Sequence, residues 1–305
     1  MSLYLKHRPS SLDQIKGNSD IIEALENMLS KPETCPHTFL LWGESGTGKT
    51  SIARIIANRL GCKGSDYREI NASDVRGIDN IRDIIQQSQF KPIEGVCRVW
   101  VIDECAKMTN EAQNAFLKIL EDTPKHVYFV LCTTDPQKLL ATIKSRCQQF
   151  QTKPLSDSQM FGLLRKIVKE ENENLDKEVY EQIIQDSLGH PRNAIQILEQ
   201  VLNVSVERRL EIAKQVSAQQ SQGIELCRAL IKGARWNEVA KILTGLKDQE
   251  PETIRRIVLG YCQSILLSGK DEPLCGLIME EFMKENFTNG FPQLTFSAYS
   301  VIKNK

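Results

Sequence analysis

Residues 39–50 read Phe-Leu-Leu-Trp-Gly-Glu-Ser-Gly-Thr-Gly-Lys-Thr, an apolar run followed by a glycine-rich loop. The apolar run predicts a buried strand, and apolar residues at helical spacing over 52–60 predict a helix directly after the loop. Residues 43–50 match G-x-x-x-x-G-K-[ST], a pattern typical of phosphate-binding loops when a strand precedes it and a helix follows. Glycines let backbone N–H groups surround phosphate oxygens, and the helix N-terminus adds partial positive charge.

Two side chains of this loop have specific expected roles. Lys49 would reach the β- and γ-phosphates, and the Thr50 hydroxyl would be a ligand of Mg²⁺. The residues of the loop expected to bind the cofactor are Ser45, Gly46, Thr47, Gly48, Lys49, Thr50 and Ser51.

A second apolar run ends in two carboxylates. Residues 99–104 read Val-Trp-Val-Ile-Asp-Glu, which predicts a buried strand with Asp103 and Glu104 at its carboxyl end. Asp103 would hold Mg²⁺ through water, and Glu104 would polarise the attacking water as a general base. The two motifs together indicate an enzyme that hydrolyses a nucleoside triphosphate. ATP is favoured over GTP because no N-K-x-D motif is present, so the expected cofactors are ATP and Mg²⁺.

The order of the patterns predicts an α/β fold followed by helices. Short β-branched or bulky runs alternate with amphipathic segments up to about residue 150, which favours a parallel sheet with helices on both faces. The expected strands cover 39–42, 67–70, 98–102, 127–132 and 148–151. From about residue 156 apolar residues recur only at helical spacing. The later helices are expected at 206–218, 223–233, 237–247, 252–268 and 273–286, with an interruption at the Gln- and Ser-rich stretch 215–222.

Composition excludes several classes of protein. The 39 basic and 39 acidic residues cancel, so nucleic acid could bind only through a local patch. The nine cysteines form no C-x-x-C pair, which argues against a disulfide framework and a zinc site. No apolar stretch is long enough to span a membrane, and residues 1–6 lack a signal-peptide core. A soluble intracellular protein is expected, in the cytoplasm or nucleus, or in the host-cell cytoplasm if viral.

Further segments, in order along residues 4–200, resemble the clamp-loader ATPase subunits of the AAA+ class. This class includes the small subunits of replication factor C and their bacterial and phage equivalents. The similar segments are Tyr4-Leu5-Lys6-His7-Arg8-Pro9 with Ile15-Lys16-Gly17-Asn18, Asn71-Ala72-Ser73-Asp74-Val75-Arg76-Gly77-Ile78-Asp79, residues 108–118, and Thr133-Thr134-Asp135-Pro136-Gln137-Lys138-Leu139 followed by Ser145-Arg146-Cys147. The segment 133–139 and the Ser145-Arg146-Cys147 triplet that follows it together form the most diagnostic signature.

The resemblance implies an architecture and an activity. It implies an AAA+ nucleotide-binding α/β domain over 1–153, a helical lid over 154–216 and a helical collar for oligomerisation over 217–305. Such a subunit hydrolyses ATP to ADP and phosphate while its complex opens a sliding clamp and loads it onto primer-template DNA. The implied partners are the other subunits of a pentamer, including a distinct one, the clamp, the DNA and the polymerase holoenzyme, with no membrane.

The resemblance also implies roles for single residues. Arg8, Pro9, Ile15 and Gly17 belong to the element that folds over the adenine. Thr134 would be the sensor that aligns the attacking water, and Arg192 would reach the γ-phosphate from the lid. Arg146 would act as an arginine finger in the site of a neighbouring subunit. The implied DNA contacts are Arg76, Arg82 and Lys107.

The sequence departs from the family pattern at three points. The phosphate loop has Glu44-Ser45 where the family usually has Pro-Pro, and Thr134 stands where replication factor C commonly has Asn. The cysteine-rich zinc insertion of the bacterial subunits is missing, which favours a subunit of replication-factor-C or phage type.

Two other functions share some of these motifs. A ring-forming AAA+ motor that translocates DNA, such as a branch-migration helicase, has the same phosphate loop and acidic pair but does not predict Ser145-Arg146-Cys147. A scaffold subunit that binds nucleotide without turnover fits poorly with the complete set of candidate catalytic residues. That set comprises Lys49, Asp103, Glu104, Thr134, Arg146 and Arg192.

Overall fold

The computed structural model describes residues 2–74, 77–247, 249–267, 272–284 and 290–304. The chain divides into two compact units, Met1–Ser205 and Val206–Lys305. The α/β part and the three helices that follow it therefore lie in one unit. The finer division at 153 and 216 stays a prediction.

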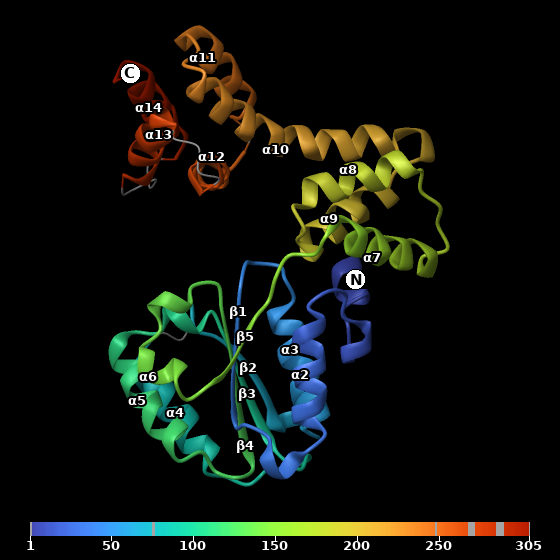
Figure 1. Cartoon of the computed structure of the whole chain (residues 1–305), viewed down its shortest axis with the longest axis vertical. Helices are drawn as coiled ribbons and strands as arrows, with labels where there is room; N and C mark the ends of the chain where they lie inside the picture. The colour runs from blue at the N-terminus through green and yellow to red at the C-terminus, as the bar shows by residue number, and fades with distance from the viewer. Residues whose placement is uncertain (1, 75–76, 248, 268–271, 285–289, 305) are drawn as a thin grey trace. The chain divides into compact units, whose positions relative to one another are not determined.

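A five-stranded parallel sheet forms the centre of the first unit, in the order β2-β3-β4-β1-β5 (Figure 1). The strands are β1 (Thr38–Trp42), β2 (Tyr67–Asn71), β3 (Arg98–Asp103), β4 (Val127–Thr133) and β5 (Gln148–Gln151). All five predicted strands and the α/β class are thereby confirmed. The order places β4 between β1 and β3, so the carboxyl ends of all three strands meet at one edge of the sheet.

Helices cover both faces of the sheet (Figure 1). One face carries α2 (Ser19–Leu29) and α3 (Lys49–Arg59), and the other carries α4 (Ile78–Ser88), α5 (Asn110–Glu121) and α6 (Ala141–Lys144). Alternate residues of a strand point to opposite faces, so Phe39 and Leu41 pack with α3 while Leu40 packs with α5. Both sets are fully buried, which explains why β1 is a continuous apolar run rather than an alternating one.

Three helices complete the first unit: α7 (Asp157–Glu170), α8 (Lys177–Ser187) and α9 (Pro191–Leu202). The predicted capping box is present, since Ser156 accepts from the backbone N–H of Gln159 and the Gln159 side chain accepts from that of Ser156. Pro191 occupies the first turn of α9, as predicted. The short N-terminal helix α1 (Leu3–Lys6) packs against α9, and the Leu3 N–H donates to Glu199 Oε1 at 3.0 Å.

Single turns of 3₁₀ helix connect several of these elements. They cover Leu12–Gln14, Pro32–Thr34, Gly64–Asp66, Cys105–Lys107, Pro136–Lys138 and Val206–Arg208.

Among the residues that the structure describes, the second unit consists of helices and short connecting turns. Its helices are α10 (Arg209–Ile231), α11 (Trp236–Gly245), α12 (Pro251–Leu267), α13 (Pro273–Met283) and α14 (Phe291–Lys303). They enclose a core of their own that includes Leu226, Val258 and Phe282. The predicted interruption at 215–222 is wrong, because α10 continues through it. Gln is a good helix former and no proline stands there, so polarity alone does not end the helix. Helix α14 was not predicted.

The cysteines behave as small apolar residues. All nine are free thiols, and eight of them are buried. Within the described ranges no group of three or more His, Cys, Asp or Glu side chains could hold a metal ion. No described helix combines the length and the apolar character that a membrane span requires.

A buried ion pair, together with backbone hydrogen bonds, holds the segment that leads into β3. The Asp66 carboxylate accepts the N–H groups of Ile93, Glu94 and Gly95 at 2.7–3.0 Å and lies 3.4 Å from Nη2 of Arg98. Burial by itself raises the pKa of Asp66, but the N–H donors and the guanidinium outweigh it and lower the pKa to about 2 from 3.8.

We expect Asp66→Asn to lower the free energy of unfolding of the first unit by about 3 kcal/mol at pH 7, since Arg98 loses its buried counter-charge. A lowered pKa stabilises the fold above the unfolded value, and this contribution disappears as pH falls from about 4 to about 2. The difference between the two proteins should shrink over that range in urea unfolding followed by tryptophan fluorescence. Asp79→Asn, which breaks the exposed Asp79–Arg82 pair, is the control and should cost about 0.5 kcal/mol or less. Equal costs for both variants would contradict this account.

Candidate functional site

The glycine-rich loop lies between β1 and α3, where the sequence placed it. Gly46 and Gly48 have positive φ angles of 80° and 99°, which turn their backbone N–H groups in a way that other residues rarely allow. Lys49 Nζ donates to the carbonyl oxygens of Gly43 at 2.8 Å and Glu44 at 2.7 Å. The lysine thus caps its own loop with hydrogen bonds that a phosphate oxygen could replace.

Lys49 is largely buried, and burial lowers the pKa of its ammonium group, although the charges of Asp103 and Glu104 act in the opposite direction. An ammonium group with so little water around it interacts strongly with an anion that enters the loop. The position therefore favours a phosphate ligand.

The acidic pair is joined to the loop by a direct hydrogen bond. Thr50 Oγ1 donates to Asp103 Oδ2 at 2.8 Å, and the backbone N–H of Glu104 donates to Asp103 Oδ1 at 2.9 Å. Glu104 adopts a left-handed conformation with φ of 51°, which is uncommon for a residue with a side chain. Strained conformations of this kind cluster at functional sites.

A cavity of about 60 Å³ unites these residues. Its walls are polar, and they are formed by Tyr4, Ser45, Gly46, Gly48, Lys49, Thr50, Ser51, Asp103, Glu104 and Arg192. The Thr50 hydroxyl and the Asp103 carboxylate supply hard oxygen donors within hydrogen-bond distance of each other, the ligand type that Mg²⁺ prefers. The residues present therefore fit a magnesium ion beside bound phosphates.

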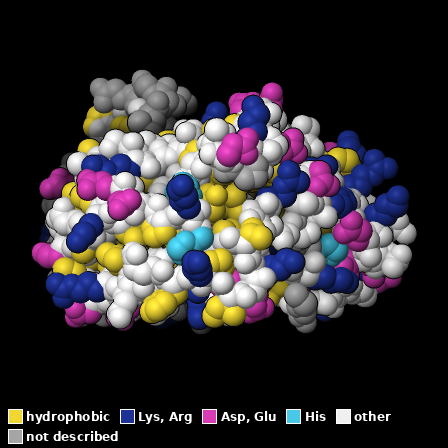
Figure 2. Space-filling model, turned by 90° about the horizontal axis from the view of Figure 1, so that it is seen from below, with side chains coloured by type: hydrophobic (Ala, Val, Ile, Leu, Met, Phe, Trp, Pro, Cys, Tyr) yellow, Lys and Arg dark blue, Asp and Glu magenta, His cyan; other side chains and the backbone are white. Residues whose placement is uncertain are grey.

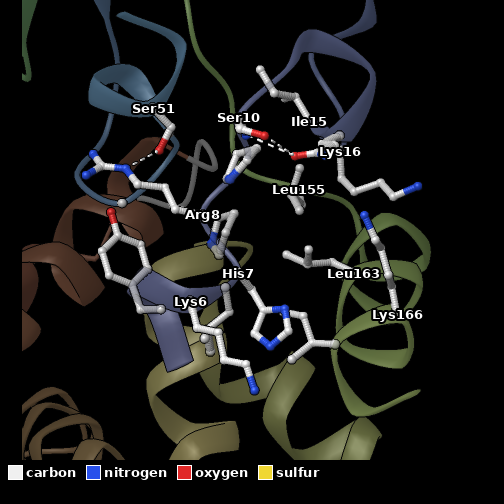
Figure 3. A pocket seen from close by; sticks show the side chains of 18 of the residues that line it. Lys6, His7, Arg8, Ser10, Ile15, Lys16, Ser51, Leu155, Leu163 and Lys166 are labelled. Atoms are coloured by element: carbon white, nitrogen blue, oxygen red, sulfur yellow. Dashed lines mark hydrogen bonds between the residues drawn. The ribbon is translucent and has the colours of Figure 1, made fainter. Parts of the chain in front are cut away.

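A larger cavity of about 320 Å³ shares part of this wall. Figure 3 shows Ile15, Leu155 and Leu163 along one side of it, with Arg8 reaching Ser51 on the other; the Arg8 Nε to Ser51 Oγ distance is 3.1 Å. Its size and mixed lining suit a nucleoside. Its lining includes Arg8, Pro9, Ile15, Gly46, Thr47, Gly48 and Ser51, and their role in cofactor binding stays a prediction.

Gly17, which the sequence placed with these residues, lies outside the lining of both cavities. A Cβ on Gly17 would approach Leu155 Cδ2 to 2.5 Å, and the φ angle there is 68°. The glycine allows the chain to pass close to Leu155, which itself lines the larger cavity. Its contribution is to packing behind the cavity wall.

Two predicted catalytic residues lie apart from these cavities. Thr134 follows β4 and is exposed, and it does not line either cavity. Arg146 follows α6, where Nη2 bonds Glu121 Oε1 at 2.5 Å and Nη1 donates to the Thr142 carbonyl at 2.8 Å. The proposed roles of both residues stay predictions.

The predicted DNA contacts are surface cations where they are described. Arg82 is exposed and pairs with Asp79 at 3.0 Å, and Lys107 Nζ donates to Ser73 Oγ at 3.0 Å. Arg76 lies outside the described residues. Basic and acidic side chains are interspersed on the face that Figure 2 displays, in keeping with the zero net charge.

Sequence reasoning missed some residues of the site. Tyr4 lines both cavities, although only its position in the N-terminal segment could have pointed to it. His190 Nε2 lies 3.1 Å from Glu44 Oε2, so the unusual glutamate of the phosphate loop pairs with the residue that precedes α9. The replacement of the usual Pro-Pro by Glu44-Ser45 marked this position as unusual, but the sequence did not show that His190 is the partner of Glu44.

We expect Gly43→Ala to destabilise the first unit by about 2 kcal/mol more than Gly48→Ala, measured by urea unfolding. Both residues have positive φ angles, of 149° and 99°, so alanine is strained at either position. At Gly43 the added Cβ would also lie 2.3 Å from the carbonyl oxygen of buried Thr152, whereas at Gly48 nothing lies within 4 Å. Equal destabilisation would show that the close approach to Thr152 is unimportant.

Comparison with known proteins gives similarities in sequence and in fold. Residues 63–156 match the family described as DNA polymerase III, delta subunit. The chain is 34% identical over 221 residues to DNA polymerase III subunit gamma of Buchnera aphidicola, covering 66% of this chain and 61% of that protein. It is 34% identical over 225 residues to subunit tau of Bacillus subtilis, covering 67% of this chain and 40% of that protein. The chain thus spans about three-fifths or less of these relatives' lengths.

Solved structures show the same fold. The RuvB Holliday junction branch migration motor of Thermotoga maritima has a TM-score of 0.62 at 19% identity, covering 78% of this chain and 85% of that chain. A DNA polymerase III gamma subunit-related protein of the same organism has a TM-score of 0.52 at 18% identity, covering 92% and 98%. The sequence relatives are bacterial polymerase III subunits, so the expected preference for a replication-factor-C or phage type is not supported. What is supported is resemblance to the bacterial members of the expected class.

Proposed function

We propose that this chain is an ATPase subunit of a sliding-clamp loader of the bacterial DNA polymerase III kind, which loads the clamp onto primer-template DNA. The observation that carries the proposal is the 2.8 Å hydrogen bond from Thr50 to Asp103, which joins the phosphate loop to the acidic strand end in one cavity. Similarity to gamma and tau subunits supports the assignment to replication.

ATP would bind across both cavities. The backbone N–H groups of the loop would surround the phosphates, and Lys49 would exchange the carbonyls of Gly43 and Glu44 for phosphate oxygens. The nucleoside would occupy the larger cavity against Ile15 and Leu155. Because the N-terminal segment, the loop and the lid helices all line that cavity, nucleotide binding would hold these three parts together.

Hydrolysis would take place beside the acidic pair. Thr50 and Asp103 would hold Mg²⁺, which when bound neutralises phosphate charge. Glu104 would accept a proton from the attacking water as the water adds to the γ-phosphorus and the bond to ADP breaks. Thr134 would align that water, and Arg192, which lines the same cavity, would stabilise charge on the phosphoryl oxygens.

Assembly would complete the site. Arg146 lies outside the lining of its own chain's cavities, so it would enter a neighbour's site as an arginine finger. This requires an oligomer, which we propose to be a pentamer with at least one distinct subunit, held by the helices of the second unit. Arg76, Arg82 and Lys107 would contact the phosphate backbone of DNA without reading its sequence.

The test is steady-state ATP hydrolysis by the chain assembled with its partner subunits, with and without primer-template DNA and the cognate sliding clamp. We expect DNA and clamp together to stimulate turnover far more than either does alone. As a control, Glu104→Gln should retain ATP binding and lose at least about a hundredfold in turnover, because the general base is gone. Stimulation by DNA alone, whatever the clamp, would indicate a translocating motor instead, and absence of turnover would indicate a scaffold.

We expect Arg146→Ala to lower turnover of the assembled complex by about 10³-fold while nucleotide binding by the isolated chain is unchanged. Glu121→Gln is the matched control, since it breaks the same ion pair and leaves the guanidinium in place. Mixing Arg146→Ala with Lys49→Ala chains should restore part of the turnover, because one variant offers an intact site and the other an intact finger. Loss of activity in Glu121→Gln, or no recovery on mixing, would refute the role in a neighbouring site.

A further inference from the structure

Tyr4 lies where the N-terminal segment meets the lid. It belongs to α1, which is fixed to α9 by the hydrogen bond from the Leu3 N–H to Glu199. The next turn of the chain is fixed to α7, because His7 lies between Glu170, with Nδ1 to Oε2 at 2.9 Å, and Glu171. Tyr4 is therefore held against the lid at two neighbouring points.

The Tyr4 ring contacts two of the cations expected to bind nucleotide. The guanidinium carbon of Arg192 lies 5.2 Å from the ring centroid, and that of Arg8 lies 6.0 Å from it. Arg192 Nη2 also donates to the Tyr4 hydroxyl at 3.4 Å, a long hydrogen bond. Both arginines thus interact with an uncharged aromatic side chain, at distances typical of cation–π contacts.

The Arg192 side chain has an unpaired hydrogen-bond donor and lies close to the phosphate loop. Its Nε is buried and has no hydrogen-bond partner among the described residues. A methyl group placed on Gly46 would meet Arg192 Cβ at 3.2 Å, so the base of the side chain touches the loop itself. Arg192 is partly buried, and a guanidinium with one buried, unpaired donor beside a phosphate site favours exchange of a neutral partner for an anionic one.

We propose that Tyr4 is a positioning residue that holds Arg192 ready for the γ-phosphate, and so helps the site distinguish a nucleoside triphosphate from a diphosphate. This inference rests on the proposed ATPase function. An arginine paired with a carboxylate would have to break a charged contact in order to bind phosphate. An arginine held by a phenol ring leaves a weaker contact for a stronger one, and its position is already restricted before the nucleotide arrives.

The positioning role of Tyr4 can be distinguished from direct contact between Tyr4 and the nucleotide by comparing triphosphate with diphosphate binding. Tyr4 also lines the larger cavity, where it could touch the nucleoside. A contact with the nucleoside would strengthen binding of triphosphate and diphosphate equally. Action through Arg192 would strengthen binding of the triphosphate alone, since only the triphosphate carries the γ-phosphate.

The experiment measures the dissociation constants of adenylyl-imidodiphosphate and ADP with Mg²⁺ for the full chain by calorimetry. We expect Tyr4→Leu to weaken binding of the triphosphate analogue by roughly three- to tenfold and to leave ADP binding almost unchanged. Tyr4→Phe, which keeps the ring, should restore the preference. In an Arg192→Ala background, Tyr4→Leu should have no further effect on either ligand.

A matched control addresses the fold of α1. Leu5→Ala changes an exposed residue of the same helix and should leave both constants unchanged, and thermal unfolding of all variants confirms that they are folded. Equal weakening of both ligands by Tyr4→Leu, or the same loss in the Arg192→Ala background, would overturn the positioning role while the proposed function stands. Failure of the unaltered chain to bind either nucleotide would overturn the proposed function itself.

Discussion

Burial of β1 and β4 on both faces of the sheet is the constraint on which the rest of the first unit depends. Their backbone groups pair with neighbouring strands, and their side chains fill the cores under α3 and α5. With both faces covered, only the ends of these strands remain available to a ligand. Chemistry is thereby confined to the edge where the carboxyl ends of β1, β3 and β4 meet.

At that edge the phosphate loop and the end of β3 form a cavity that charged side chains line. Thr50 at the start of α3 reaches across to Asp103, while Lys49 turns back onto its own loop. In an extended strand the side chains of Asp103 and Glu104 would point to opposite faces. The left-handed backbone at Glu104 breaks the line of β3, and both carboxylates line the same cavity. One member of the pair is held by hydrogen bonds, and the other is left to face the cavity.

Helices α7 and α9 and the N-terminal segment supply the remaining walls. His190 pairs with Glu44, and the Arg192 guanidinium lies over the Tyr4 ring. His7 lies between Glu170, the last residue of α7, and Glu171, which follows it. These contacts join elements that are far apart in the sequence. The walls of the two cavities therefore come from the phosphate loop, the N-terminal segment and helices α7 and α9 together.

The sequence by itself determined the five strands, the phosphate loop, the acidic pair and the capping of α7. Each of these is a local pattern, because strand burial, glycine conformation and helix caps depend on neighbouring residues. Only the tertiary structure decided that Gly17 packs behind Leu155 instead of lining the cavity, that α10 continues through a Gln- and Ser-rich stretch, and that Tyr4 meets Arg192. Those outcomes depend on which distant side chains come together, and no spacing along the chain encodes such contacts.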